Sequence, residues 1–143
     1  MLKKINLQYL LSYFGLVPFF ILILDKYFFW KIKGEISLSF LIYYILIIFV
    51  FIGSMNWNLK IKINEHIVIY GFLPSIFATT IIIFNQYYSN HIYILLVLIF
   101  LILLQLLFDY YFIYLDEINK HAFFYLRLPL TLLIILFSLI IIS

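Results

Sequence analysis

Residues 92–108 read IYILLVLIFLILLQLLF, a stretch in which Gln105 is the only side chain carrying an amide or a charge. A helix that crosses a hydrocarbon layer of roughly 30 Å needs about 20 largely apolar residues, each of which advances it by about 1.5 Å. The stretch approaches this length and contains no Gly or Pro that would end a helix. It therefore predicts a helix that spans a membrane.

Four other stretches of the chain share this character. They cover residues 7–24, 36–55, 67–84 and 128–143. The segments between them are short, so consecutive helices should lie next to one another and run in opposite directions. The predicted fold class is all-α: a polytopic integral membrane bundle of five transmembrane helices, forming one domain over residues 1–143.

The composition excludes several classes of protein. Of the 143 residues, 68% are hydrophobic and 10% are charged, whereas a soluble domain has about 25% charged residues. A soluble domain of this size could not bury so much apolar surface, so the lipid bilayer is the predicted partner. The nine Lys and Arg residues are scattered, which argues against binding to nucleic acid. The absence of cysteine excludes disulfides and thiolate chemistry.

The distribution of positive charge predicts the orientation. With five spans, six cationic residues fall on the side of the N-terminus and three on the opposite side. Lys and Arg concentrate in segments that stay in the cytoplasm, so the N-terminus is predicted to be cytoplasmic and the C-terminus external. The six are Lys3, Lys4, Lys60, Lys62, Lys120 and Arg127, and the three are Lys26, Lys31 and Lys33.

Polar residues gather at the predicted cytoplasmic ends of four spans. Gln105 and Asp109 stand one helical turn apart at the end of the fourth span, and Arg127 begins the fifth. Others close the second span or open the third. The candidate polar cluster comprises Asn56, Trp57, Tyr70, Pro74, Ser75, Gln105, Asp109 and Arg127.

Two interpretations of this cluster stay open. In one, Asp109 and Arg127 pair inside a cytoplasm-facing pocket, since ionisable groups near hydrocarbon are costly and often functional. In the other, both side chains lie at the interface, extend to water and hold two helix ends together.

Prolines and small residues within the spans predict where the helices bend and pack. Pro18 in the first span and Pro74 in the third each remove an amide donor, and we expect kinks there. Gly71, Ser75 and Thr79 follow one another at four-residue spacing, which predicts a close helix-packing face.

No motif for catalysis or for a metal is present. No two of His66, His91 and His121 stand three or four residues apart, so no metal and no cofactor is predicted. A paired-carboxylate site, a nucleophile elbow and a phosphate loop are equally absent. The sequence thus gives no support to an enzyme.

Five motifs carry a resemblance to a known family. They are GLVPF at 15–19, FIGSMNW at 51–57, YGFLPSIFA at 70–78, QLLFD at 105–109 and YLRLPLT at 125–131. In this order they resemble the domain of unknown function 3429 family. The family's second motif reads Gly-Gly followed by His-Trp, and Ser54 and Asn56 depart from it. The resemblance implies a small polytopic inner-membrane protein of bacteria or mitochondria, and brings no activity, cofactor or substrate.

Two functions remain open on these grounds. The first is a non-catalytic subunit, scaffold or assembly partner that binds other inner-membrane subunits or its own copies. The second is a protein that binds or transports a small molecule, a lipid or a quinone, with Asp109 and Arg127 in a cytoplasm-facing pocket.

Overall fold

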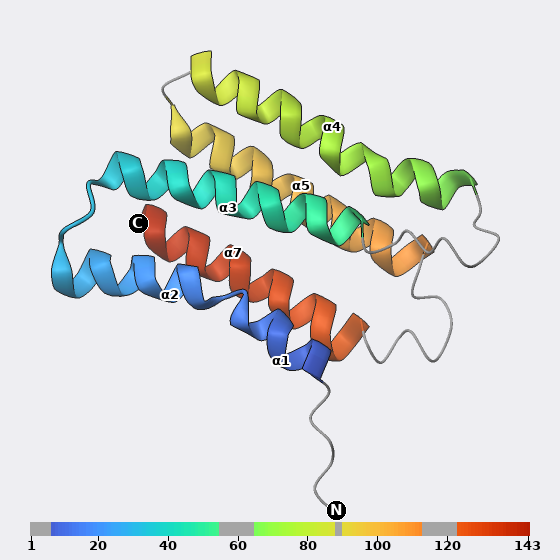
Figure 1. The fold of residues 1–143 in the computed structure, drawn as a ribbon, viewed down its shortest axis with the longest axis horizontal. Helices are drawn as coiled ribbons and strands as arrows, with labels where there is room; N and C mark the ends of the chain where they lie inside the picture. The colour runs from blue at the N-terminus through green and yellow to red at the C-terminus, as the bar shows by residue number, and fades with distance from the viewer. Residues whose placement is uncertain (1–6, 55–64, 88–89, 113–122) are drawn as a thin grey trace, which may run out of the picture. The chain divides into compact units, whose positions relative to one another are not determined.

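In the computed structural model, every regular element of the described residues is a helix (Figure 1). The described residues are 7–54, 65–87, 90–112 and 123–143. The helices are α1 (Leu7–Phe14), α2 (Val17–Leu24), η1 (Asp25–Phe29), α3 (Gly34–Ser54), α4 (Glu65–Tyr87), α5 (His91–Phe112), η2 (Phe123–Arg127) and α7 (Leu128–Ile142).

Five helical segments are long and apolar enough to cross a membrane, which confirms the predicted class. They are Ser12–Phe29, Gly34–Ser54, His66–Tyr87, His91–Tyr111 and Phe123–Ile142. Between 17% and 33% of each segment is buried within the protein. The rest of each segment is partly or fully exposed, as a lipid solvent allows. The described helices are therefore compatible with a multi-pass membrane protein.

The chain forms two compact units. One contains residues 1–37 and 105–143, and so holds the first span, the end of α5, η2 and α7. The other contains residues 38–104, with most of α3, α4 and most of α5.

The first span is interrupted near its middle. α1 ends at Phe14 and α2 begins at Val17, with the amide of Leu16 donating to the carbonyl of Tyr13 over 3.0 Å. Pro18 lies in the first turn of α2, where a helix needs no amide donor. The break therefore precedes the proline, and Pro18 starts a helix instead of kinking one.

The first span also continues beyond its predicted end at residue 24. The predicted span ends at residue 24 because the charged residues Asp25 and Lys26 follow it, but both belong to the π-helix η1, which extends the span to Phe29. The reason is that both charges have partners. The Asp25 carboxylate accepts the backbone amides of Lys31 and Ile32, and the Lys26 ammonium donates to the carbonyls of Ile140 and Ile141.

Within the first unit, the first span and α7 run parallel. The Tyr13 hydroxyl donates to the Tyr125 carbonyl of η2, just before α7, over 3.1 Å. Farther along both segments the rings of Phe20 and Phe137 pack with centroids 4.7 Å apart. Lys26 reaches the last turn of α7. Parallel spans require an odd number of spans between them, and three of the candidate spans in the described residues lie between the first span and α7.

Side chains of the first span satisfy backbone groups at both ends of the fifth span, which consists of η2 and α7. Pro129 has no amide hydrogen for the carbonyl four residues earlier, that of Tyr125, and the Tyr13 hydroxyl donates to it. Carbonyls in the last turn of a helix also lack intrahelical donors. The Lys26 ammonium lies 3.0 Å from the Ile140 carbonyl oxygen and 3.1 Å from that of Ile141.

Replacing Lys26 with Met should lower the free energy of unfolding by about 1–2 kcal/mol, because it removes a cation from the negative end of a helix. Thermal unfolding in mild detergent, followed by circular dichroism, measures this effect. Lys33→Met is the matched control, since Lys33 is exposed and the change in charge is the same. Equal melting temperatures for the two variants would contradict the capping role.

In the second unit, α3 and α4 run antiparallel and approach closely. Gly53 near the end of α3 lies against Pro74 and Gly71 in the first half of α4. Toward the other end of the pair, the Asn85 amide of α4 donates to the Tyr43 hydroxyl of α3 over 3.2 Å. The absence of a side chain at Gly53 permits the close approach.

The face of α4 that packs differs from the prediction. Ser75 is half-buried and Thr79 is exposed, and the Thr79 hydroxyl donates to the Ser75 carbonyl within the same helix. A strict four-residue row rotates by about 40° per step around a helix and leaves the contact face. The buried residues alternate steps of three and four, and they are Gly71, Pro74, Ala78, Ile81 and Asn85.

Candidate functional site

The candidate site centres on Arg127, which lies where the π-helix η2 meets the α-helix α7. It is the last residue of η2 and the N-cap of α7. Pro129 follows within the first turn of α7, where its fixed backbone suits a helix start. Short π-helical segments are often found at functional sites, and this one carries a charged side chain inward.

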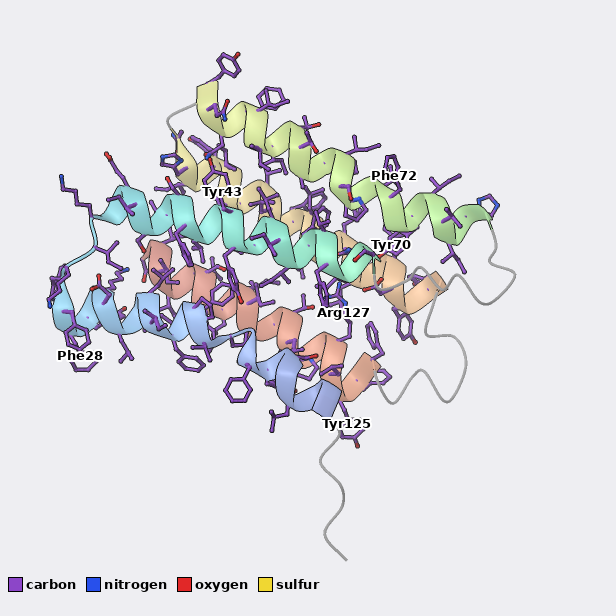
Figure 2. All side chains as sticks on the ribbon, viewed as in Figure 1. Phe28, Tyr43, Tyr70, Phe72, Tyr125 and Arg127 are labelled. Atoms are coloured by element: carbon purple, nitrogen blue, oxygen red, sulfur yellow. The ribbon has the colours of Figure 1, made fainter. Side chains whose placement is uncertain are left out.

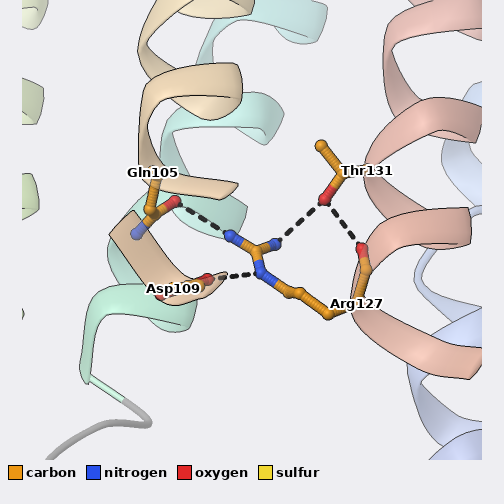
Figure 3. Close-up of polar contacts among 4 residues, drawn as sticks. All are labelled: Gln105, Asp109, Arg127 and Thr131. Atoms are coloured by element: carbon orange, nitrogen blue, oxygen red, sulfur yellow. Dashed lines mark hydrogen bonds and ion pairs between the residues drawn. The ribbon is translucent and has the colours of Figure 1, made fainter. Parts of the chain in front are cut away.

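Each nitrogen of the Arg127 guanidinium has a partner within the chain (Figure 3). Nε donates to the Asp109 carboxylate over 2.6 Å, which is also an ion pair. One terminal nitrogen donates to the Thr131 hydroxyl over 3.2 Å, and the other contacts the Gln105 carbonyl oxygen over 3.4 Å. The Thr131 hydroxyl in turn donates to the Arg127 carbonyl over 2.9 Å. We call these four residues the arginine cluster.

The arginine cluster is buried. The side chains of Arg127 and Asp109 are 9% and 3% exposed, and Thr131 is fully buried. Neither charged side chain extends to the surface, contrary to the interfacial interpretation. The ion pair does hold two helix ends together, as the same interpretation predicted. Gln105 and Asp109 come from α5, while Arg127 and Thr131 come from η2 and α7.

The other predicted residues belong to the second unit or lie outside the described residues. Tyr70, Pro74 and Ser75 belong to α4 in the second unit, where Pro74 packs against Gly53. Figure 2 shows Tyr70 and the outward-facing Phe72 on this helix. Asn56 and Trp57 lie outside the described residues. The structure thus brings together Gln105, Asp109 and Arg127 of the predicted set and adds Thr131.

A second polar cluster was not predicted. Asn85 is buried, and its amide connects three helices: the nitrogen donates to Tyr43 of α3, and the oxygen lies 3.0 Å from Nδ1 of His91 at the start of α5. The predicted third span ends at residue 84 and the fourth begins at residue 92, so Asn85 and His91 were expected to lie in the loop between them. The signal that locates Asn85 is its spacing from Ala78 and Ile81, which continues the buried face of α4.

Some Ser and Thr hydroxyl groups of the spans donate within their own helices. Thr80 and Ser138 each donate to the carbonyl four residues earlier, over 2.9 Å and 2.6 Å. This local bonding lets hydroxyls lie in an apolar medium without a partner on another helix. Across the described ranges, no three side chains of His, Asp or Glu are placed to hold a metal ion.

Compared with models of protein families, with curated proteins and with solved structures, the chain matches none.

Proposed function

We propose that this protein is a non-catalytic component of a membrane assembly, in which it acts as a subunit, scaffold or assembly partner. The observation that carries the proposal is that the buried charged group is already occupied. All three guanidinium nitrogens of Arg127 have partners inside the chain, and its charge is balanced by Asp109. A site prepared for a ligand would instead direct charged groups into open space.

The proposal includes the location and orientation of the chain. We place it in a bacterial cytoplasmic membrane or a mitochondrial inner membrane, on the resemblance to the domain of unknown function 3429 family. The excess of positive charge on the side of the N-terminus supports a cytoplasmic N-terminus and an external C-terminus. Accessibility of introduced cysteines to an impermeant thiol reagent tests the orientation, because the chain has no cysteine of its own.

Copurification tests the proposed role. A tagged chain extracted in mild detergent should elute with the same enriched membrane proteins, or as an oligomer, in repeated preparations. We propose that the arginine cluster stabilises the fold and does not bind a ligand. If the double variant Asp109→Leu/Arg127→Met folds, it should therefore copurify with the same membrane proteins. A wild-type chain that always elutes alone as a monomer would contradict the proposal.

Binding of a small molecule, a lipid or a quinone makes the opposite prediction. If Asp109 and Arg127 hold a ligand, the charges themselves are required, and a folded apolar double variant must lose it. Mass spectrometry of small molecules retained by the purified wild-type chain and by Asp109→Asn and Arg127→Ala separates the two functions. Retention that is lost in both folded variants would favour the binding function over the proposed one.

A further inference from the structure

The turn between the first span and α3 is held in a fixed shape by one residue. The Trp30 amide donates to the Asp25 carbonyl over 2.7 Å, and Trp30 adopts the left-handed conformation with φ of 50°. The Asp25 carboxylate accepts the amides of Lys31 and Ile32 over 3.3 Å and 3.0 Å. Both the main chain and the side chain of Asp25 therefore satisfy backbone donors of the turn. We call residues 25–33 the interfacial turn.

The interfacial turn presents four consecutive aromatic side chains outward. Tyr27, Phe28, Phe29 and Trp30 are 52%, 75%, 62% and 77% exposed, and Figure 2 shows Phe28 at this turn. The turn joins two segments that are each long enough to cross a membrane, so it lies where a span meets the interface. Tyr and Trp are favoured at that depth because one part of the side chain is apolar and another can hydrogen-bond with water, while the wholly apolar rings of Phe28 and Phe29 suit the acyl-chain side.

The three lysines of the interfacial turn have different surroundings. The Lys26 ammonium is directed at the carbonyls of α7. Lys31 and Lys33 are exposed beside the aromatic side chains. The Asp25 carboxylate is engaged with backbone amides, so it is not directed at these two ammonium groups. Lys31 and Lys33 are thus placed to bind an anion at the membrane surface.

We infer that the interfacial turn binds anionic phospholipid headgroups, with its aromatic side chains at the boundary between headgroups and acyl chains and with Lys31 and Lys33 on the phosphates. A lysine near an anionic membrane surface is worth about 1 kcal/mol, which corresponds to an enrichment of up to about fivefold for each lysine. Lys26 of the same segment holds the last turn of α7. Headgroup binding therefore fixes α7 relative to the membrane, whatever partner the protein serves.

The fluorescence of Trp30 tests this site directly. The chain has two tryptophans, so Trp57→Phe leaves Trp30 as the only one. This full-length variant is reconstituted in two kinds of vesicle that contain phosphatidylcholine and phosphatidylglycerol in the same ratio. In one the phosphatidylglycerol is brominated, and in the other an equal amount of phosphatidylcholine is brominated. Brominated phosphatidylglycerol should quench Trp30 more strongly, and bromines near the headgroup should quench more than bromines near the chain end.

Lysine variants in the same background assign the preference to the turn. In Lys31→Gln/Lys33→Gln, the two brominated lipids should quench the fluorescence of Trp30 equally. Lys60→Gln/Lys62→Gln is the matched control, with the same spacing and the same loss of charge, and it should keep the preference. Equal quenching in the parent, or a preference that survives in Lys31→Gln/Lys33→Gln, would overturn the inference. Strongest quenching by bromines at the chain ends would overturn the interfacial placement.

Discussion

Replacing Arg127 with Met lowers the free energy of unfolding by about 3–5 kcal/mol, the range expected when one partner of a buried ion pair is removed. The Asp109 carboxylate, 3% exposed, then loses the guanidinium that lies 2.6 Å away. Gln105 and Thr131 lose their contacts to the same group. Thermal or denaturant unfolding of the purified chain in mild detergent measures the change.

A double variant separates the charge from the packing. Asp109→Leu/Arg127→Met should be more stable than Arg127→Met alone, because a pair of apolar side chains leaves no unpaired charge in the interior. Arg127→Lys should recover only part of the stability, since an ammonium lacks the planar fork that reaches Asp109, Gln105 and Thr131 together. If Arg127→Met lowered the free energy of unfolding no more than Lys33→Met, a change at an exposed residue, the ion pair would contribute little to stability.

Replacing Gly53 with Val forces α3 and α4 apart and lowers the free energy of unfolding by about 1–3 kcal/mol. A Cβ atom at Gly53 would lie 2.6 Å from Cγ of Pro74 and 3.2 Å from the carbonyl oxygen of Gly71. Neither neighbour can move easily, because one belongs to a closed ring in a helix and the other to the backbone. The same unfolding measurement detects this effect.

Pro74 provides the matched second site. In the background of Pro74→Ala, which removes Cγ of the ring, the further change Gly53→Val should cost less than in the wild type. Gly34→Val is the control for glycine itself, since a Cβ there meets nothing within 4 Å. If Gly53→Val and Gly34→Val had equal effects, the close contact between α3 and α4 would not limit stability.

Much of the fold could be predicted because apolar length by itself decides where a helix can cross a membrane. The stretch at 92–108 lies within α5, His91–Phe112, and each of the other four predicted stretches coincides with most of one helical segment. The end of a helical segment differs from the predicted end where a polar residue has a hydrogen-bond partner in the tertiary structure. Asp25 and Lys26 are the clearest case, because bonds to residues 31, 32, 140 and 141 keep both in a helix.

The candidate site could be predicted only in part. The spacing of Gln105 and Asp109 placed them on one face of a helix, and local geometry determines that result. Their burial with Arg127 could not be predicted, since a charge at the end of a span can extend to water or turn inward. Asn85 was missed for a related reason: its partners Tyr43 and His91 come from two other helices.

The sequence by itself determined how many described helical segments are long and apolar enough to cross a membrane, because this follows from how many consecutive apolar residues the chain contains. Only the tertiary structure decided which polar groups meet. It placed Arg127 against Asp109, directed Lys26 to the carbonyls of α7, and selected the face of α4 that carries Gly71 and Asn85. In spans that are apolar all around, no stripe of hydrophobicity marks the inner face, so close packing and hydrogen bonding between helices select it.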